Sequence, residues 1–118
     1  MKKEFLYVGY YIDIYNYLIL KVGTTKDLNR RQKEHNKSYR KSSANHRMAD
    51  DSEFTYIWSH QLSKYNTHRF EDRTIEQWKE ENIGEYIRND RFVCEDIPEI
   101  VTIKIRNTYE IKVKERVA

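Results

Sequence analysis

The sequence lacks the residues and runs that would place it in several large classes of protein. Cys94 is the only cysteine among 118 residues, which excludes an intrachain disulfide and a zinc site built from cysteines. We expect its thiol to be buried and unreactive. No apolar run approaches the roughly 20 residues that cross a bilayer, and the Met-Lys-Lys start lacks the apolar stretch of a signal peptide. These absences predict a soluble protein of the cytoplasm.

The charge of the chain is modest in total but unevenly placed. The formal net charge is +3, whereas residues 21–47 hold nine basic and two acidic residues, an excess of seven positive charges that leaves −4 elsewhere. Such a concentration of positive charge favours a polyanionic partner, nucleic acid before a membrane. A solvated basic surface without a partner is the alternative that charge alone leaves open.

Apolar and polar patterning predicts an α+β fold in one domain, residues 1–118. Strands are indicated at 5–14, 17–22 and 54–62, and helices at about 26–36 and 66–82. We expect a small central antiparallel three-stranded sheet flanked by these helices. Residues 1–96 would form this core, and 97–118 would add a C-terminal β-hairpin with a cationic outer face.

Local signals indicate where the elements begin and end. Thr24 or Thr25 is expected to cap the first helix, and Gly84 to end the second. Between the first helix and the third strand, residues 37–52 are polar, basic and rich in serine. This composition predicts a mobile loop that orders on a ligand.

Residues 21–35 carry the clearest functional pattern. The stretch is typical of a strand end, a turn and a helix start, with Arg31 and His35 one helical turn apart on one face. A guanidinium beside an imidazole can hold a phosphate by charge-assisted hydrogen bonds, while the imidazole relays a proton or steadies a water. Lys21, on the strand that leads into this helix, adds a third group. A basic helix face at the surface is the simpler alternative.

The first strand supplies further candidates. A short hairpin would set Gly9 and Tyr11 beside Lys21 on the second strand, and Gly9 leaves room for a ligand or a backbone to approach. Whether Tyr10 or Tyr11 faces the site depends on strand register, because a slip of one residue reverses the faces. Ordinary amphipathic strand tyrosines are the alternative.

Acidic residues on the second predicted helix are candidates for a metal ligand. Hydrolysis of a phosphodiester without a covalent intermediate needs an activated water and a stabilised leaving oxygen, and a divalent metal can provide both. Glu71 leads over its neighbour Asp72 as an oxygen ligand for Mg²⁺, and Glu76 on the same helix stays open. No D-x-D or H-E-x-x-H pattern supports them, so the general preference for acids near a helix N-terminus is the simpler explanation.

The order of these motifs resembles the GIY-YIG nuclease superfamily. Gly9-Tyr10-Tyr11 stands where that family has Gly-Ile-Tyr, and Lys21-Val22-Gly23 stands where it has Tyr-Ile-Gly. The Lys-Val-Gly variant and the later Gly84-Glu85-Tyr86-Ile87 are similar to the phage- and virus-rich branch of the superfamily. The resemblance is close over residues 5–36 and extends to about residue 94.

The resemblance implies roles for individual residues. Tyr11 would act as a general base or hold the attacking water, Arg31 would stabilise the phosphate in the transition state, and His35 would assist. Glu71 would be the single ligand of Mg²⁺, for which Mn²⁺ would substitute. Lys21 replaces the second tyrosine of most members, and its charge would lower the pKa of Tyr11 or bind the phosphate.

Together these roles predict a Mg-dependent endonuclease that hydrolyses DNA. The basic residues expected to contact the DNA backbone are Lys26, Arg30, Lys37, Arg40, Lys41 and Arg47. A domain of this size would form a homodimer, take its specificity from a protein partner, or nick DNA with little sequence preference. Two alternatives stay open: a catalytically weak or inactive nucleic-acid-binding module on the same scaffold, and a protein-interaction domain.

Overall fold

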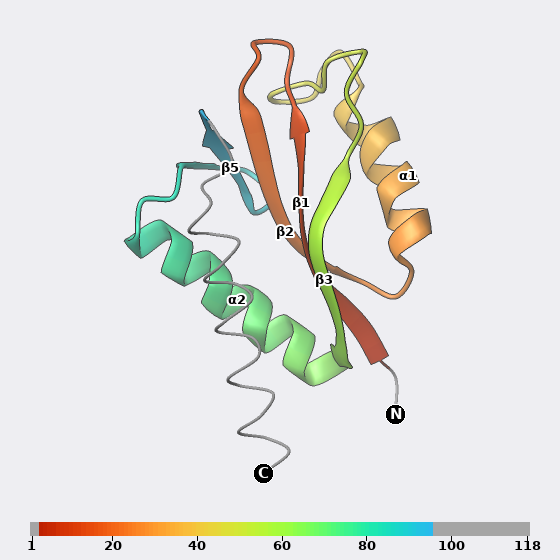
Figure 1. Cartoon of the computed structure of the whole chain (residues 1–118), viewed down its shortest axis with the longest axis vertical. Coiled ribbons are helices and arrows are strands. Elements are labelled where there is room, and N and C mark those ends of the chain that lie inside the picture. Colours follow the sequence, from red (N-terminus) through yellow and green to blue (C-terminus); the bar gives the residue numbers. More distant parts are fainter. Residues whose placement is uncertain (1–2, 96–118) are drawn as a thin grey trace.

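Over residues 3–95, the part of the chain that this computed structural model describes, the protein folds around a five-stranded antiparallel sheet with a helix on each face (Figure 1). The strand order is β3-β1-β2-β5-β4. The elements along the chain are β1 (Lys3–Ile12), β2 (Leu18–Thr25), α1 (Leu28–Tyr39), β3 (Thr55–Ser63), α2 (Lys64–Glu80), β4 (Glu85–Ile87) and β5 (Arg91–Cys94).

The sheet is larger than the pattern predicts. The α+β class is confirmed, but the three-stranded sheet is wrong, because β4 and β5 extend it beyond β2. These strands have three and four residues, which is too short to show a period-two alternation. The predicted C-terminal β-hairpin lies outside the described residues.

Alternation along β1 and β2 sends side chains into two cores on opposite faces of the sheet. The face that α2 covers has a core of Leu6, Val8, Leu18, Leu20, Val22, Ile75, Trp78, Phe92 and Cys94. The face that α1 covers is more aromatic, with a core of Tyr7, Tyr11, Ile19, Tyr39, Met48 and Phe54. Burial raises the pKa of the Cys94 thiol to about 11, in agreement with an unreactive cysteine.

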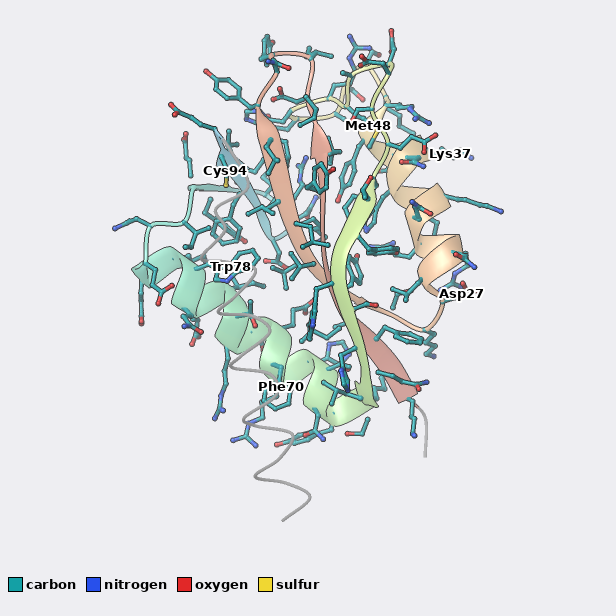
Figure 2. All side chains as sticks on the ribbon, viewed as in Figure 1. Asp27, Lys37, Met48, Phe70, Trp78 and Cys94 are labelled. Atoms are coloured by element: carbon teal, nitrogen blue, oxygen red, sulfur yellow. The ribbon has the colours of Figure 1, made fainter. Side chains whose placement is uncertain are left out.

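The second helix packs through the stripe that its sequence predicts. Ile75 and Trp78 are buried, and Phe70 is partly buried against the same core. Figure 2 shows the labelled Phe70 and Trp78 along α2. Neither helix within residues 3–95 is both long and apolar enough to span a membrane.

The helix ends differ from those predicted. Asp27, and not Thr24 or Thr25, caps α1, because its side chain accepts a hydrogen bond from the backbone N–H three residues later at 3.0 Å. The residue with left-handed backbone after α2 is Asn82, at φ 53°, and not Gly84. Asparagine tolerates this conformation better than most residues, so it can end a helix as glycine does.

A β-bulge at Gly9 reorients β3. Val8 pairs with Trp58 and Gly9 with Tyr56, so one residue of β3 is left unpaired between them. A Cβ atom on Gly9 would lie 2.4 Å from Phe54 Cζ, so a side chain there would collide with the aromatic core. As a result Phe54 and Tyr56 pack on the α1 side while Trp58 packs on the α2 side, which the simple alternation of β3 does not predict.

The chain between α1 and β3 is anchored to the sheet. The first helix continues to Tyr39, and the carbonyl of that residue accepts a hydrogen bond from the Met48 backbone N–H at 2.7 Å. Met48 is fully buried, and His46 Nδ1 lies 2.9 Å from the buried Asp13 carboxylate. The mobile loop predicted for residues 37–52 is therefore a helical turn followed by turns held at several points.

Candidate active site

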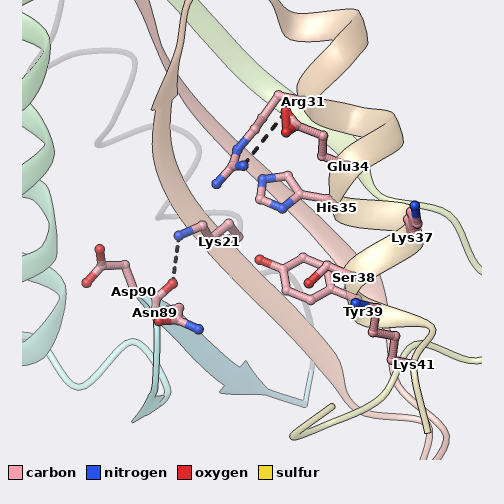
Figure 3. A pocket seen from close by; sticks show the side chains of 10 residues that line it. All are labelled: Lys21, Arg31, Glu34, His35, Lys37, Ser38, Tyr39, Lys41, Asn89 and Asp90. Atoms are coloured by element: carbon pink, nitrogen blue, oxygen red, sulfur yellow. Dashed lines mark hydrogen bonds and ion pairs between the residues drawn. The ribbon is translucent and has the colours of Figure 1, made fainter. Parts of the chain in front are cut away.

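A pocket of about 580 Å³ lies between α1 and the β4–β5 turn, over the edge of β2 (Figure 3). It is lined by Lys21, Arg31, Glu34, His35, Lys37, Ser38, Tyr39, Lys41, Asn89 and Asp90. Three of the predicted site residues, Lys21, Arg31 and His35, therefore meet at one cavity. The fold brings the strand residue and the two helix residues together because β2 runs directly into the loop that starts α1.

Lys21 is the strand residue at the centre of this pocket. It pairs with Gly9 on one side and Arg91 on the other, and is only 7% exposed. Its Nζ donates a hydrogen bond to the Asn89 carbonyl at 2.6 Å. Burial lowers the pKa of Lys21 to about 8, against the opposing effect of the Asp90 and Glu71 carboxylates. The ammonium group is thus mostly charged at neutral pH.

Tyr7, which the motif analysis did not select, completes a buried cluster with His35 and Arg31. The Tyr7 hydroxyl oxygen lies 2.6 Å from His35 Nε2. Burial raises the pKa of this hydroxyl, and the Arg31 guanidinium opposes that rise. Burial lowers the pKa of His35 to about 3, with further lowering by the charges of Arg31, Lys21 and Arg91. His35 is therefore neutral and can accept a hydrogen bond from Tyr7.

Tyr11 lies elsewhere on the same face. Its hydroxyl donates to the His46 carbonyl at 3.0 Å and accepts from Arg91 Nη1 at 2.7 Å, and its ring stacks on Tyr39. The register places Tyr10 on the α2 side, so between the two it is Tyr11 that faces α1. The structure nevertheless brings Tyr7, and not Tyr11, to Arg31 and His35.

The strand register contains the signal that identifies Tyr7. Tyr7 pairs directly with Gly23, two residues after Lys21, and its hydroxyl fills the space that a side chain would occupy. A Cβ atom on Gly23 would lie 2.4 Å from Tyr7 Oη. A glycine opposite a tyrosine is therefore what leaves room for the phenol to reach His35.

Glu71 approaches the pocket from the opposite face of the sheet. It is half-buried on α2, while Glu76 on the same helix is exposed. Burial raises the pKa of Glu71, with Lys21 opposing and Asp90 adding to that rise. β5 pairs with β2 as far as Lys21, and the next residue, Val22, still donates its N–H to the Asp90 carbonyl at 3.2 Å. Of the two glutamates named from the sequence, Glu71 is the one whose charge acts on Lys21.

Comparison with known proteins adds the family. The family model of the T5orf172 domain matches residues 4–115. The chain belongs to the T5orf172 domain family. No curated protein and no solved structure matches it. Membership in this family is compatible with a nuclease-like or DNA-binding role, and it does not specify a reaction.

The site of this T5orf172 domain suits a bound anion. Arg31 Nε is a buried polar atom with no hydrogen-bond partner among the described residues, which is a costly state for a guanidinium unless a ligand completes it. The neighbouring Glu34 carboxylate lies 3.9 Å from Arg31 Nη1 and is itself 47% exposed. An exposed ion pair of that length contributes little, so it leaves Arg31 available to a phosphate.

The carboxylates near Lys21 are the candidates for a metal ligand. No group of three or more His, Cys, Asp or Glu residues that could hold a metal is present within residues 3–95. The negative charge of Asp90 adds to the rise in the pKa of Glu71. One or two carboxylate oxygens completed by water match what Mg²⁺ prefers.

The predicted DNA contacts divide into two groups. Lys37 and Lys41 line the pocket of Figure 3, and a neighbouring pocket contains Lys26 and Arg30. By contrast, Arg40 and Arg47 line none of these pockets. Arg40 donates a hydrogen bond to the Ser52 carbonyl at 2.7 Å, and the Arg47 carbonyl accepts one from the backbone after Asp13 at 2.9 Å.

Proposed function

We propose that this T5orf172 domain is a Mg-dependent endonuclease that hydrolyses DNA phosphodiester bonds. The observation that carries the proposal is the convergence of Lys21, Arg31 and His35 on one pocket, with the Tyr7 hydroxyl 2.6 Å from His35 Nε2 and the Glu71 charge acting on Lys21. Two cations at one cavity and a buried hydrogen-bonded phenol beside it suit an activated water and a phosphate.

The phosphate is held by the two cations. Arg31 supplies a planar fork with one unpartnered N–H, and Lys21 supplies a point charge held in place by the Asn89 carbonyl. Negative charge on the phosphate oxygens rises as water attacks phosphorus and the P–O bond to the leaving sugar breaks. Cations fixed before the reaction stabilise that charge without reorganisation.

Tyr7 is the residue placed to hold the attacking water. In the tautomer that leaves Nε2 of His35 unprotonated, the Tyr7 O–H donates to that nitrogen at 2.6 Å. The phenol oxygen keeps a lone pair that can accept a hydrogen bond, and we place the attacking water there. Burial raises the pKa of Tyr7, so it orients the water as a neutral phenol.

Glu71 is the residue that would hold Mg²⁺, with Asp90 nearby and water in the other positions. The metal, or Mn²⁺ in its place, would supply Lewis-acid stabilisation of the leaving oxygen. The resemblance to the GIY-YIG nucleases supports this arrangement. In this proposal Tyr7, which bonds His35, takes the role that the resemblance assigns to Tyr11, and Lys21 stands in for the second tyrosine.

The proposal is tested by plasmid cleavage in Mg²⁺ with the full chain. We expect Arg31→Ala and Glu71→Gln to lower the rate about 100-fold to 1,000-fold, whereas Glu76→Gln on the exposed side of α2 matches the wild type. Equal rates for all four proteins would reject the site. DNA binding by the wild type without cleavage in Mg²⁺ or Mn²⁺ would instead favour the alternative, a binding module on the same scaffold.

A further inference from the structure

Two further pockets adjoin the central one, on opposite sides along α1. The first, of about 440 Å³, shares Arg31 and Glu34 with the central pocket. The second, of about 230 Å³, shares Lys41 and Asn89 with it. The outer pockets have no lining residue in common. The three cavities therefore follow one another as a row from the start of α1 to the turns after it.

Every pocket of this row contains basic side chains from more than one element. The first outer pocket adds Lys26, Arg30, Lys64 and His68. The second outer pocket adds Arg88 and Arg91. Lys64 comes from the start of α2, and Arg88 from the β4–β5 turn, so both walls of the row carry positive charge.

The carboxylates that line the row already have partners on the protein. Glu34 lies 3.6 Å from Arg30 Nε and 3.9 Å from Arg31 Nη1. Glu4 is buried and lies 3.5 Å from His68 Nε2. Asp90 accepts a hydrogen bond from the Tyr86 hydroxyl at 3.0 Å. Nine Lys or Arg side chains line the three pockets against these three carboxylates, so the net charge facing the row is positive.

The length of the row exceeds one phosphate. From Arg30 to Lys41 the chain advances eleven residues, or roughly 16 Å at the helical rise. A stacked strand carries one phosphate for about every 3.4 Å of its axis. The row thus has room for the phosphate at the reacting groups and at least one more on each side.

We propose that the three pockets form one continuous track for the backbone of a single DNA strand, with the scissile phosphate in the central pocket and flanking phosphates in both outer pockets. The position of the scissile phosphate rests on the proposed function. Because phosphates bind in the pockets on both sides of the cut, the DNA strand must continue in both directions from the scissile phosphate. The substrate is then an internal linkage, and a terminal nucleotide or a short diester is a poor one.

The first test measures binding alone, in the full-length Glu71→Gln background without metal. The outer pockets are each altered by one substitution, Lys64→Gln or Arg88→Gln, and Lys33→Gln is the control because that exposed α1 lysine lines no pocket of the row. For a single-stranded oligonucleotide in 0.1 M salt, each outer substitution should raise Kd about sixfold and lower the salt slope by about 0.7. The control should change neither.

The second test uses oligonucleotides in which one native phosphodiester is flanked by uncharged methylphosphonates. With the wild type in Mg²⁺, cleavage of that linkage should fall at least about tenfold relative to the fully charged strand. Binding losses as expected but no cleavage of any strand would reject the proposed function and retain the track. Cleavage that is indifferent to flanking charge, with Lys64→Gln and Arg88→Gln binding like Lys33→Gln, would overturn the track and retain the function.

Discussion

At the scale of single residues, burial decides what each polar group of the site can do. Tyr7 and His35 are almost completely enclosed, at 0% and 3% exposure, so the hydrogen bond between them is shielded from bulk solvent. Lys21 is almost as enclosed, yet carries a charge that two carboxylates support. If they were exposed to solvent, Tyr7, His35 and Lys21 would be ordinary surface residues.

The two tyrosines of β1 are expected to differ in their effect on cleavage. Tyr7→Phe removes the hydroxyl beside Arg31 and should lower the cleavage rate at least about 100-fold. Because it also leaves the buried His35 nitrogen without its partner, it should cost about 1–3 kcal/mol of unfolding free energy. Tyr11→Phe removes the hydroxyl that Arg91 bonds and should cost about 1–3 kcal/mol of unfolding free energy while the rate changes little. Plasmid cleavage and urea unfolding of both variants measure this. The reverse pattern of cleavage rates would restore Tyr11 to the site.

Lys21 makes anion binding sensitive to pH. Its ammonium loses the proton as pH rises through about 8, so affinity for an oligonucleotide should fall between pH 7 and 9 at constant ionic strength. Lys21→Met, which has no charge to lose, should bind more weakly at pH 7 and show no such fall. Fluorescence anisotropy across this range gives the comparison. An identical pH dependence in both proteins would remove Lys21 from the phosphate contacts.

At the scale of elements, α1 positions Arg31 and His35 through the place where it begins. Asp27→Ala removes the cap and should cost about 1 kcal/mol of unfolding free energy. Thr24→Ala, at a residue that patterning favoured as a cap, should cost clearly less. Urea unfolding followed by circular dichroism distinguishes them, and equal losses would mean that the Asp27 side chain does not cap the helix in solution.

The elements also show how far patterning reaches. The hairpin of β1 and β2, the helix carrying Arg31 and the inward stripe of α2 follow from periodicity, because each is long enough for a repeat to be visible. The bulge at Gly9 and the strands β4 and β5 do not, because they depend on tertiary pairing over a few residues.

The residues of the candidate site, like the elements of the fold, could be predicted only in part from the sequence. Lys21, Arg31 and His35 could be found from motif spacing along the chain. Tyr7 could not, because its place depends on which residue of β2 it faces, and one slip of register would exchange it for a neighbour. Asp90 sits beside Asn89 in a turn where both residues have left-handed backbone, with φ near 57° and 59°, and no local signal marks it as part of a site.

At the scale of the whole molecule, a buried neutral histidine makes the fold sensitive to acid. The pKa of His35 is about 3 in the folded chain, against an ordinary value of 6.5 for a solvated histidine. As pH falls below 6.5 the unfolded chain takes up a proton that the folded chain does not, so stability is lost between these values. From pH 7 to 5 we expect about 2 kcal/mol of loss from this residue.

Urea unfolding at pH 7 and pH 5 measures that loss. His35→Gln, which has no proton to take up, should lose about 2 kcal/mol less than the wild type over the same interval, although it starts from lower stability. A wild type and variant that lose stability in parallel would show that His35 is not held neutral in the folded chain.

The short pairing of β5 with β2 sets the entrance to the reacting groups. The ladder ends at Lys21 and Arg91, and the Val22 N–H beyond it still donates to the Asp90 carbonyl at 3.2 Å. Two more pairs of residues would carry the ladder to Gly23 and close that entrance with backbone. The length of the β4–β5 hairpin is therefore a way to control access to the site. Lengthening this hairpin should block the site while every reacting side chain stays in place.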